Sequence, residues 1–282
     1  MNKLNHKNKK YKELKFWFSD TDSIFKAFKN YCLDFDDKKK RRIFIDRNSD
    51  ILLVAHADTV QKPQLWGYDG NMLYGAGFDD RIGCYAAFTL SKSLKCDLLI
   101  TDLEESFGST GKYHKCKKYN WIAEFDRAGN DAVHYDLTNK EWNIAIEEQF
   151  EIGFGSYSDI ASLDTDSCCV NIGVGYKDAH AKKSCCDMDM YNSQITKFKA
   201  FYAENKDVKF VIDETMQYSN YYRGYGFSGY GYDYDDYGGK PIKPGKLLYP
   251  CDICGDCSGE LVYGTIICEK CFNAMLTDNI YR

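Results

Sequence analysis

Short apolar runs that end at a histidine or a carboxylate recur along the chain, and they constrain its fold more than any other feature. Runs of this length suit buried strands, and the polar residue that follows marks where each strand leaves the core. Four runs share the pattern: residues 51–57 with His56 and Asp58, residues 98–101 with Glu104 and Glu105, residues 121–125 with Asp126, and residues 169–174 with His180.

Helical patterns separate these runs and complete the fold prediction. A further strand is expected at residues 42–46, joined to residues 51–57 by a turn at 48–50. Strands that alternate with helices predict an α/β fold, a mostly parallel central sheet with helices on both faces. Three helices are expected: one capped by residues 20–22 with Ile24, Phe25, Phe28 and Cys32 on one face, one carrying Ile82, Ala86, Leu90 and Leu94, and one carrying Ile195, Phe198, Phe201 and Tyr202.

The polar residues after the strands have the chemistry of a zinc site. In open α/β sheets ligands bind beyond the carboxyl ends of the strands, so these groups should meet at one edge. Asp79 joins them from the loop that opens the second helix. Two histidines and three carboxylates suit two zinc ions, with one carboxylate bridging them. Asp58 is placed to hold the other nitrogen of His56, and the pair Glu104 and Glu105, pointing to opposite sides of a strand end, divides metal binding from proton transfer.

The combined motifs resemble the di-zinc exopeptidase superfamily, which includes carboxypeptidase G-like and acylase-like peptidases and single-domain zinc aminopeptidases. The resemblance covers roughly residues 20–210 and rests on residues 56–60 (HADTV), 74–81 (YGAGFDDR) and 102–111 (DLEESFGSTG). Residues 155–159 also resemble the family's Ser-Asp turn near the substrate. The resemblance implies that His56 and Asp126 hold one zinc, Glu105 and His180 hold the other, Asp79 bridges the two, Glu104 is the general base and Asp58 orients His56.

The function expected from this resemblance is hydrolysis of a peptide or amide bond in a small-molecule substrate, with metal-bound hydroxide as nucleophile. Only about thirty residues separate Asp126 from Ser158, too few for the lid domain of many relatives. A compact, aminopeptidase-like exopeptidase is therefore favoured. The stretch after His180 lacks an acidic residue often found in relatives, so the substrate class stays open. Two alternatives remain: an amidase or deacetylase acting on a non-peptide bond, and a catalytically silent binding protein that reuses the fold.

The C-terminal part predicts a separate zinc module. Two Cys-x-x-Cys pairs, thirteen residues apart, are typical of a zinc ribbon spanning residues 247–282 with one structural zinc. Residues 216–246, rich in tyrosine and glycine, separate it from a catalytic domain at 1–215, as a linker or an interaction segment. A protein partner is expected at the ribbon or at this segment, whereas acidic residues among the ligands disfavour nucleic acid. The expected ligands are Cys251, Cys254, Cys268 and Cys271, with Cys257 as a competing ligand.

Composition indicates the cellular location of the protein and the roles of the residues outside the predicted site. A net charge of −5 gives no nucleic-acid-coating surface, and neither an export signal nor a membrane span is visible. Thirteen cysteines then favour thiols and zinc ligands in a reducing cytoplasm, with the eight outside the ribbon as buried or partly buried thiols. The basic run at residues 38–42 is interpreted as a solvated turn. His114 is expected at the surface, and His6 and His134 lie outside the predicted site.

Overall fold

The computed structural model describes residues 9–155, 157–213, 249–250, 258–262 and 265–267. The chain divides into two compact units, residues 1–226 and 227–282. In the second unit, β12 (Tyr249–Pro250), β13 (Ser258–Val262) and β14 (Thr265–Ile267) form an antiparallel sheet. The predicted linker and the cysteines at 251, 254, 257, 268 and 271 lie outside the described residues, so the zinc ribbon and the domain boundaries remain predictions.

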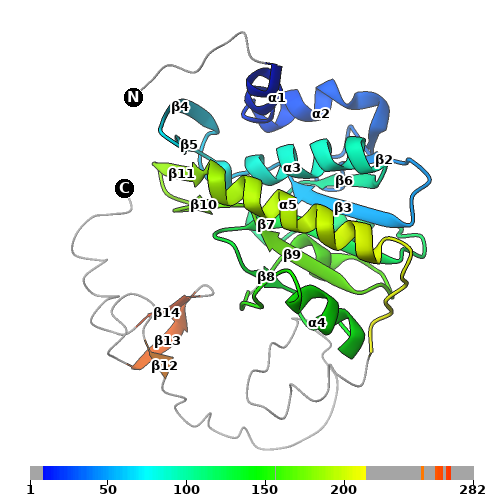
Figure 1. Cartoon of the computed structure of the whole chain (residues 1–282). Helices are drawn as coiled ribbons and strands as arrows, with labels where there is room; N and C mark the ends of the chain where they lie inside the picture. Colours follow the sequence, from blue (N-terminus) through cyan, green and yellow to red (C-terminus); the bar gives the residue numbers. More distant parts are fainter. Residues whose placement is uncertain (1–8, 156, 214–248, 251–257, 263–264, 268–282) are drawn as a thin grey trace, which may run out of the picture. The chain divides into compact units, whose positions relative to one another are not determined.

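The first unit is built on a seven-stranded sheet in the order β1-β2-β6-β3-β7-β9-β8 (Figure 1). Its four inner strands β6, β3, β7 and β9 are parallel, and the strands at its two edges join antiparallel. This sheet confirms the predicted α/β class with a parallel centre. The strands are β1 (Cys32–Leu33), β2 (Arg42–Ile45), β3 (Ile51–His56), β6 (Asp97–Thr101), β7 (Trp121–Arg127), β8 (Ala132–Val133) and β9 (Cys169–Gly173).

The three predicted helices are present. In α2 (Thr21–Ala27), Asp20 caps the helix by accepting the backbone N–H of Ser23 at 2.9 Å. The prediction that this helix reaches Cys32 is wrong, because a 3₁₀ turn, η1 (Lys29–Tyr31), intervenes and Cys32 begins β1. The other helices are α1 (Lys9–Trp17), α3 (Phe78–Leu94), α4 (Lys140–Glu147) and α5 (Met188–Asn205).

The two faces of the sheet are covered differently. Each of the five helices contributes buried side chains to the larger core, which packs on the face carrying Leu53, Ala55 and Ala123. The opposite face, carrying Leu52 and Val54, is covered by loops and by the 3₁₀ turn η4 (Asp159–Ser162), which packs against η3 (Thr110–Tyr113). The expectation of helices on both faces therefore holds for α-helices on one face only.

A second, four-stranded sheet was not predicted, and it matters for the site. Its order is β10-β11-β5-β4, with all strands antiparallel. β5 pairs with β11 along Gly75 and Ser184, so the loop after β5 and the loop before β11 leave one end of this sheet together. Gly75 is required because a Cβ there would lie 2.2 Å from the carbonyl oxygen of Gln64. The strands are β4 (Gln64–Asp69), β5 (Met72–Ala76), β10 (Tyr176–Lys177) and β11 (Ser184–Asp187).

Two arginines in the basic run are buried, which corrects its interpretation as a solvated turn. Arg41 is only 6% exposed, and its guanidinium donates to Asp102 at 2.6 Å and to Asp22 at 2.7 Å. It also lies 4.3 Å above the ring of Phe25. Arg42 is 7% exposed. The run therefore ties α2 to the segment that follows β6, because a buried guanidinium needs carboxylate partners.

His114 is also buried, contrary to the surface position expected from its lysine neighbours. Only 4% of it is exposed, and its ring centre lies 4.5 Å from that of Phe44. Burial lowers the pKa of His114 to about 4, so the imidazole is neutral near pH 7. The local sequence is basic, but the C-terminal end of η3 turns the ring toward β2.

Three other predictions are settled by the described residues. The eight cysteines outside the predicted ribbon are free thiols, five buried and three partly buried, as expected. The residues between Asp126 and Ser158 form β8 and α4, which belong to the main unit, so no lid domain is inserted there. Within the described part of the chain, no helix is both long enough and apolar enough to cross a membrane.

Candidate metal centre

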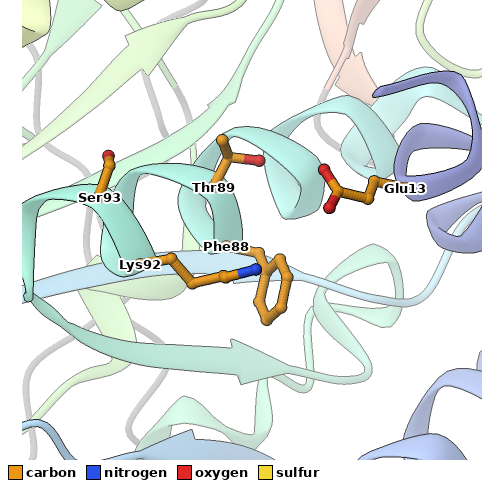
Figure 2. Close-up of a pocket in the computed structure, with 5 residues that line it drawn as sticks. All are labelled: Glu13, Phe88, Thr89, Lys92 and Ser93. Carbon is orange, nitrogen blue, oxygen red and sulfur yellow. The ribbon is translucent and has the colours of Figure 1, made fainter. Parts of the chain in front are cut away.

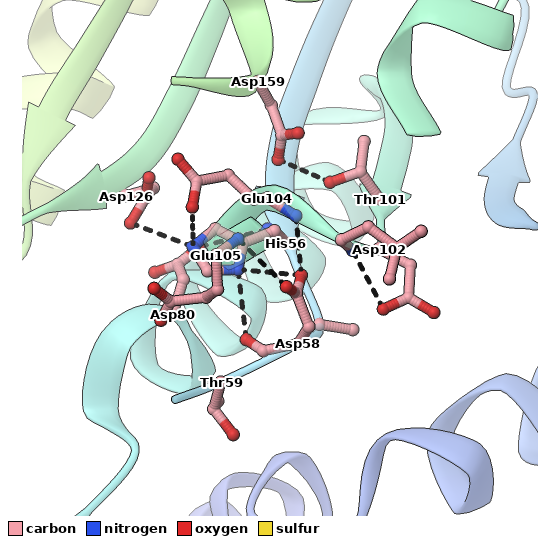
Figure 3. A network of polar contacts seen from close by, with 12 residues as sticks. His56, Asp58, Thr59, Asp80, Thr101, Asp102, Glu104, Glu105, Asp126 and Asp159 are labelled. Atoms are coloured by element: carbon pink, nitrogen blue, oxygen red, sulfur yellow. Dashed lines mark hydrogen bonds and ion pairs between the residues drawn. The ribbon is translucent and has the colours of Figure 1, made fainter. Parts of the chain in front are cut away.

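His56 ends β3 with its imidazole fully buried, and one ring nitrogen has no hydrogen-bond partner. Its Nδ1 lies 3.1 Å from the backbone carbonyl of Asp58 and 3.4 Å from the carboxylate of the same residue. The orphaned atom is Nε2, which faces carboxylates without hydrogen-bond geometry (Figure 3). A buried polar atom without a partner is costly unless a ligand satisfies it, so Nε2 marks a binding position.

The atoms around this nitrogen form two sets that share Asp79. In the first set, His56 Nε2 lies 3.4 Å from Asp79 Oδ1 and 3.4 Å from Asp126 Oδ1. In the second, His180 Nε2 lies 3.2 Å from Asp79 Oδ2 and 3.0 Å from Glu105 Oε2. Ligands that surround one zinc ion tetrahedrally at about 2.0–2.2 Å are separated by roughly 3.4 Å. Both sets have that spacing, and each takes a different oxygen of Asp79.

Two loops place Asp79 and His180 opposite each other. Asp79 follows β5 at the start of α3, where Gly77 adopts a left-handed conformation and the Asp79–Asp80 peptide is cis. His180 lies between β10 and β11, and β11 pairs with β5. The pairing of these short strands therefore brings together two predicted ligands that are far apart in the sequence.

The carboxylate of Asp58 holds the loop of the two glutamates as well as facing the imidazole. It accepts the backbone N–H of Glu104 at 3.1 Å and that of Glu105 at 3.0 Å. Burial acts to raise the pKa of Asp58, but the contact with His56 and the two backbone donors outweigh it, so the pKa is lowered. Asp58 thus fixes the position of these two glutamates relative to His56.

Glu104 and Glu105 point to different partners, although they lie on a 3₁₀ turn, η2 (Glu104–Ser106), and not on the predicted strand end. Glu105 contacts His180 and accepts the backbone N–H of Val60 at 3.3 Å. Glu104 Oε2 lies 3.8 Å from His56 Nε2. Burial, followed by the charges of nearby carboxylates, raises the pKa of Glu104 to about 7. A carboxyl group with that pKa can both accept and donate a proton near neutral pH.

Asp126 is set by an irregularity in β7. The pairing of β7 with β9 shifts register between Glu124 and Arg127, and Asn171 on β9 fills the gap. The side-chain amide of Asn171 accepts the backbone N–H of Asp126 at 2.9 Å and donates to its carbonyl at 2.7 Å. Tyr176 contacts the carboxylate of Asp126 at 3.4 Å. Such bulges re-aim a side chain, and here the carboxylate turns toward His56.

Buried acids that were not predicted surround the ligands. Asp80 is fully buried and accepts the backbone N–H groups of His56 at 3.3 Å and Gly83 at 3.0 Å. It forms a group with His56 and Asp126 whose potential ligand atoms lie within 4.8 Å of one another. Each oxygen of Asp80 accepts one of these backbone N–H groups, so Asp80 also braces the main chain at His56. Its sequence signal was weak, one acid beside another in a loop.

Glu124 and Asp159 are two further fully buried acids whose charges act on each other and on Glu104 (Figure 3 labels Asp159). Glu124 bonds the hydroxyl of Ser158 and leaves one oxygen without a partner, and Asp159 bonds Thr101 and Ser109. The signal for Glu124 was available, since it is a charged residue inside an apolar run. The predicted Ser-Asp turn lies partly outside the described residues, at 156, while Ser158 and Asp159 are buried beneath the site.

Carboxylates outnumber imidazoles in this cluster, so the site as a whole favours cations. Burial raises the pKa of Asp126, Asp80 and Glu124 well above the ordinary range, and the like charges of neighbouring carboxylates add to the effect. Charges crowded in this way are stable together only with protons or metal ions among them.

None of these groups lines the shallow pocket of about 180 Å³ between α1 and α3, which Glu13, Phe88 and Lys92 border (Figure 2).

Comparisons with known proteins find likeness in fold and none in sequence. No protein-family model matches the chain, and no curated protein matches it. A tripeptidase from Staphylococcus aureus aligns over 71% of this chain and 98% of its own, with 11% identity and a TM-score of 0.49. A TET aminopeptidase from a marine sediment thaumarchaeon aligns over 76% and 99%, with 11% identity and a TM-score of 0.49. The aminopeptidase PepT of Bacillus cereus aligns over 70% and 98%, with 11% identity and a TM-score of 0.43.

At such identities and scores the likeness reaches no further than the fold. What this chain does is therefore argued from the geometry of its own residues.

Proposed function

We propose that this chain is a two-zinc hydrolase that removes the N-terminal residue of small peptides. The observation that carries the proposal is the position of Asp79, whose two oxygens face two different histidines at 3.4 and 3.2 Å. A carboxylate shared in this way is what two adjacent metal ions require. His56 and Asp126 would hold one zinc, Glu105 and His180 would hold the other, and Asp79 would bridge them.

The chemistry of the donors supports zinc. Neutral imidazole and carboxylate are zinc ligands, and three protein ligands for each ion leave room for water and substrate. The orphaned Nε2 of His56 supplies the vacant donor, because its Nδ1 is already engaged by Asp58. Zinc in such a site polarises a carbonyl group and lowers the pKa of water.

Glu104 is proposed as the general base. Its carboxylate lies beside the first set of ligands, 3.8 Å from His56 Nε2, and none of the close ligand-to-ligand contacts involves it. A carboxylate in this position can take a proton from the attacking water and return it to the leaving amine. Asp58 holds the backbone N–H of Glu104, which keeps this carboxyl group in place between the two transfers.

The proposed ligands and the proposed base all belong to the first compact unit. The segment between Asp126 and Ser158 adds no lid, so the single unit carries the site by itself. An amidase or deacetylase would use the same ligands and the same base. The peptidases of similar fold favour the peptide bond as the first substrate class to test.

Metal analysis of the full-length protein joined to a peptide hydrolysis screen tests the proposal. We expect about three zinc ions per chain, two at the proposed site and one at the predicted ribbon, as four cysteines hold one ion. A Cys254→Ser/Cys271→Ser variant should keep about two ions and the activity. Glu104→Gln should keep its zinc while kcat falls by about 10²- to 10⁴-fold. One zinc per chain without hydrolysis of any substrate contradicts the proposal.

A further inference from the structure

His180, the exposed ligand of the second set, lies on a hairpin loop that buries little of itself. The loop spans residues 178–183 between β10 and β11, and five of these six residues are exposed. Asp178 at its start is left-handed and accepts the backbone N–H of Ala181 at 3.0 Å, which closes a turn inside the loop. Few buried contacts mean local mobility, so a metal ligand at this position needs support from outside the hairpin.

Gln61 provides such support. Its side-chain amide donates to the backbone carbonyl of His180 at 3.1 Å. The hydroxyl of Thr59 in turn donates to the backbone carbonyl of Gln61 at 2.8 Å, and Gln61 is partly buried. Because the amide holds the main chain of His180 and not its ring, the imidazole keeps Nε2 for the carboxylates of Asp79 and Glu105.

The same short segment holds the other ligand that belongs only to the second set. The backbone N–H of Val60 donates to Oε1 of Glu105 at 3.3 Å, while Oε2 of that carboxylate lies 3.0 Å from His180 Nε2. A donor on one carboxylate oxygen fixes the direction of the other. Two consecutive residues, Val60 and Gln61, therefore hold Glu105 and His180.

Both ends of this segment are fixed as well. Asp58 at its start accepts two backbone N–H groups from the turn of the glutamates, at 3.1 and 3.0 Å. Its other end packs on Gly77, where an added Cβ would lie 3.1 Å from the carbonyl oxygen of Gln61 and 3.1 Å from Cα of Pro63. Gly77 precedes the shared ligand Asp79 by two positions. The segment thus contacts the chain at or beside each ligand of the second set.

The first set of ligands is held in a different way. His56 and Asp126 lie on strands of the central sheet, and the backbone of Asp126 is bound by Asn171 on β9. Strands of a sheet hold their side chains more rigidly than loops do. Loss of the contact between Gln61 and His180 should therefore act on the second set.

We propose that Gln61 is the positioning residue that sets how tightly the second set of ligands binds its zinc ion. The inference rests on the proposed function, because it takes Glu105 and His180 as zinc ligands. Gln61 acts through the main chain of His180 and has no part in the proton transfers assigned to Glu104.

A zinc titration of the metal-free, full-length protein in competition with a chelating dye tests the inference. The ion of the predicted ribbon is identified by comparison with the Cys254→Ser/Cys271→Ser variant. Gln61→Met keeps the length of the side chain and removes its N–H donors. In this variant the weaker of the two site ions should bind about 10- to 100-fold less tightly, while the tighter ion binds as in the wild type.

Two further variants separate position from charge and from chance. Gln61→Glu adds a negative charge, which alone would tighten zinc, but a carboxylate cannot donate to the carbonyl of His180, so the weaker ion should again bind less tightly. Gln149→Met is the matched control, because Gln149 is also partly buried and follows α4, which carries no proposed ligand. It should change neither affinity.

The outcomes separate the inference from the proposed function. Unchanged zinc affinity in Gln61→Met, or tighter zinc in Gln61→Glu, overturns the positioning role. Equal weakening of both ions, with a lower urea midpoint of metal-free Gln61→Met, overturns it too and assigns Gln61 to the stability of the whole unit. A wild type that binds both site ions and hydrolyses no peptide ends the proposed function but leaves the inference standing. A wild type that binds no zinc beyond the ribbon ion ends both.

Discussion

The two histidines of the candidate metal centre differ sharply in their exposure, whereas Asp126 and Glu105 are 8% and 10% exposed. In the first half, the side chains of His56 and Asp126 are 0% and 8% exposed, and both come from strands of the central sheet. In the second, His180 is 60% exposed and comes from a loop of the small sheet. Buried ligands on strands are held rigidly, whereas a ligand on an exposed loop can move. We infer that the first half holds its ion tightly and the second half meets solvent and substrate.

The largest effect is expected where the two halves join. Asp79→Asn removes the shared negative charge, so both ions should be lost and kcat/KM should fall by at least about a thousandfold. Zinc content and hydrolysis of a small peptide measure this. Asp69→Asn, an exposed acid on β4, is the control and should change neither. Retention of two ions in Asp79→Asn contradicts the shared ligand.

Removing the histidine of one half should lower the free energy of unfolding by a different amount from removing the histidine of the other. His56→Ala leaves buried carboxylates without their cationic partner, which costs about 3–5 kcal/mol in the free energy of unfolding of the metal-free protein. His180→Ala removes an imidazole that is 60% exposed, although its carboxylate partners are each 10% exposed, and it should cost less than His56→Ala. Urea denaturation with chelator present measures both values. Equal costs would contradict the contrast between the halves.

A chelator titration tests whether the two halves also differ in how readily they lose their metal ions. The wild-type site should lose its two ions in separate steps, the exposed half first, because solvent and chelator reach His180 directly. His180→Ala should retain one ion per site through the first step. Simultaneous loss of both ions from the wild type would mean that the two halves bind as one unit.

The pH dependence of the unfolding free energy of the metal-free protein tests the burial of the proposed base, Glu104. The pKa of Glu104 is raised from 4.5 to about 7, so the folded state keeps a proton that the unfolded state releases. The resulting contribution to stability is complete below pH 4.5 and is lost as pH rises toward 7, about 3 kcal/mol in all. Glu104→Gln should flatten this decline in unfolding free energy. An unchanged slope would contradict the burial of the carboxyl group.

His114 provides a control with the opposite sign, and it packs on Phe44, away from the ligands. Its pKa is lowered from 6.5 to about 4, so protons bind the unfolded state first as pH falls. Its contribution to stability is therefore present above pH 6.5 and lost toward pH 4, again about 3 kcal/mol. His114→Phe should remove that loss and leave zinc binding unchanged.

The two halves of the site also differ in how far the sequence predicts them. His56 and Asp126 lie at the ends of apolar runs, so the strand pattern and the rule for parallel sheets predict that they meet, and their side chains lie 3.4 Å apart. The partner of Asp79 depends on the pairing of β5 with β11, two short strands with no strong apolar pattern, and only the resemblance to a family linked it to His180. Periodicity carries no information about such long-range pairing.

The sequence gives the least information about which charged side chains are buried. Arg41 and His114 were assigned to the surface because their neighbours are basic, and Glu124 was passed over inside a strand. In each case the burial is decided by a partner or packing surface elsewhere in the chain: Asp22 and Asp102 for Arg41, Phe44 for His114, and Ser158 for Glu124. A local pattern predicts that a charge prefers water, and it cannot show that a buried partner has been supplied.

The smallest predicted effect tests whether the backbone of the turn that carries Glu104 and Glu105 is strained. Leu103 and Phe107, both at positive φ, flank Glu104 and Glu105. Glycine adopts this conformation without the steric cost, so Phe107→Gly should raise the free energy of unfolding by up to about 1 kcal/mol even though glycine loses more chain entropy on folding. Thermal denaturation of the zinc-loaded protein measures the change. A loss of stability would contradict the prediction and show that packing of the ring, as against Tyr157, outweighs the strain at this position.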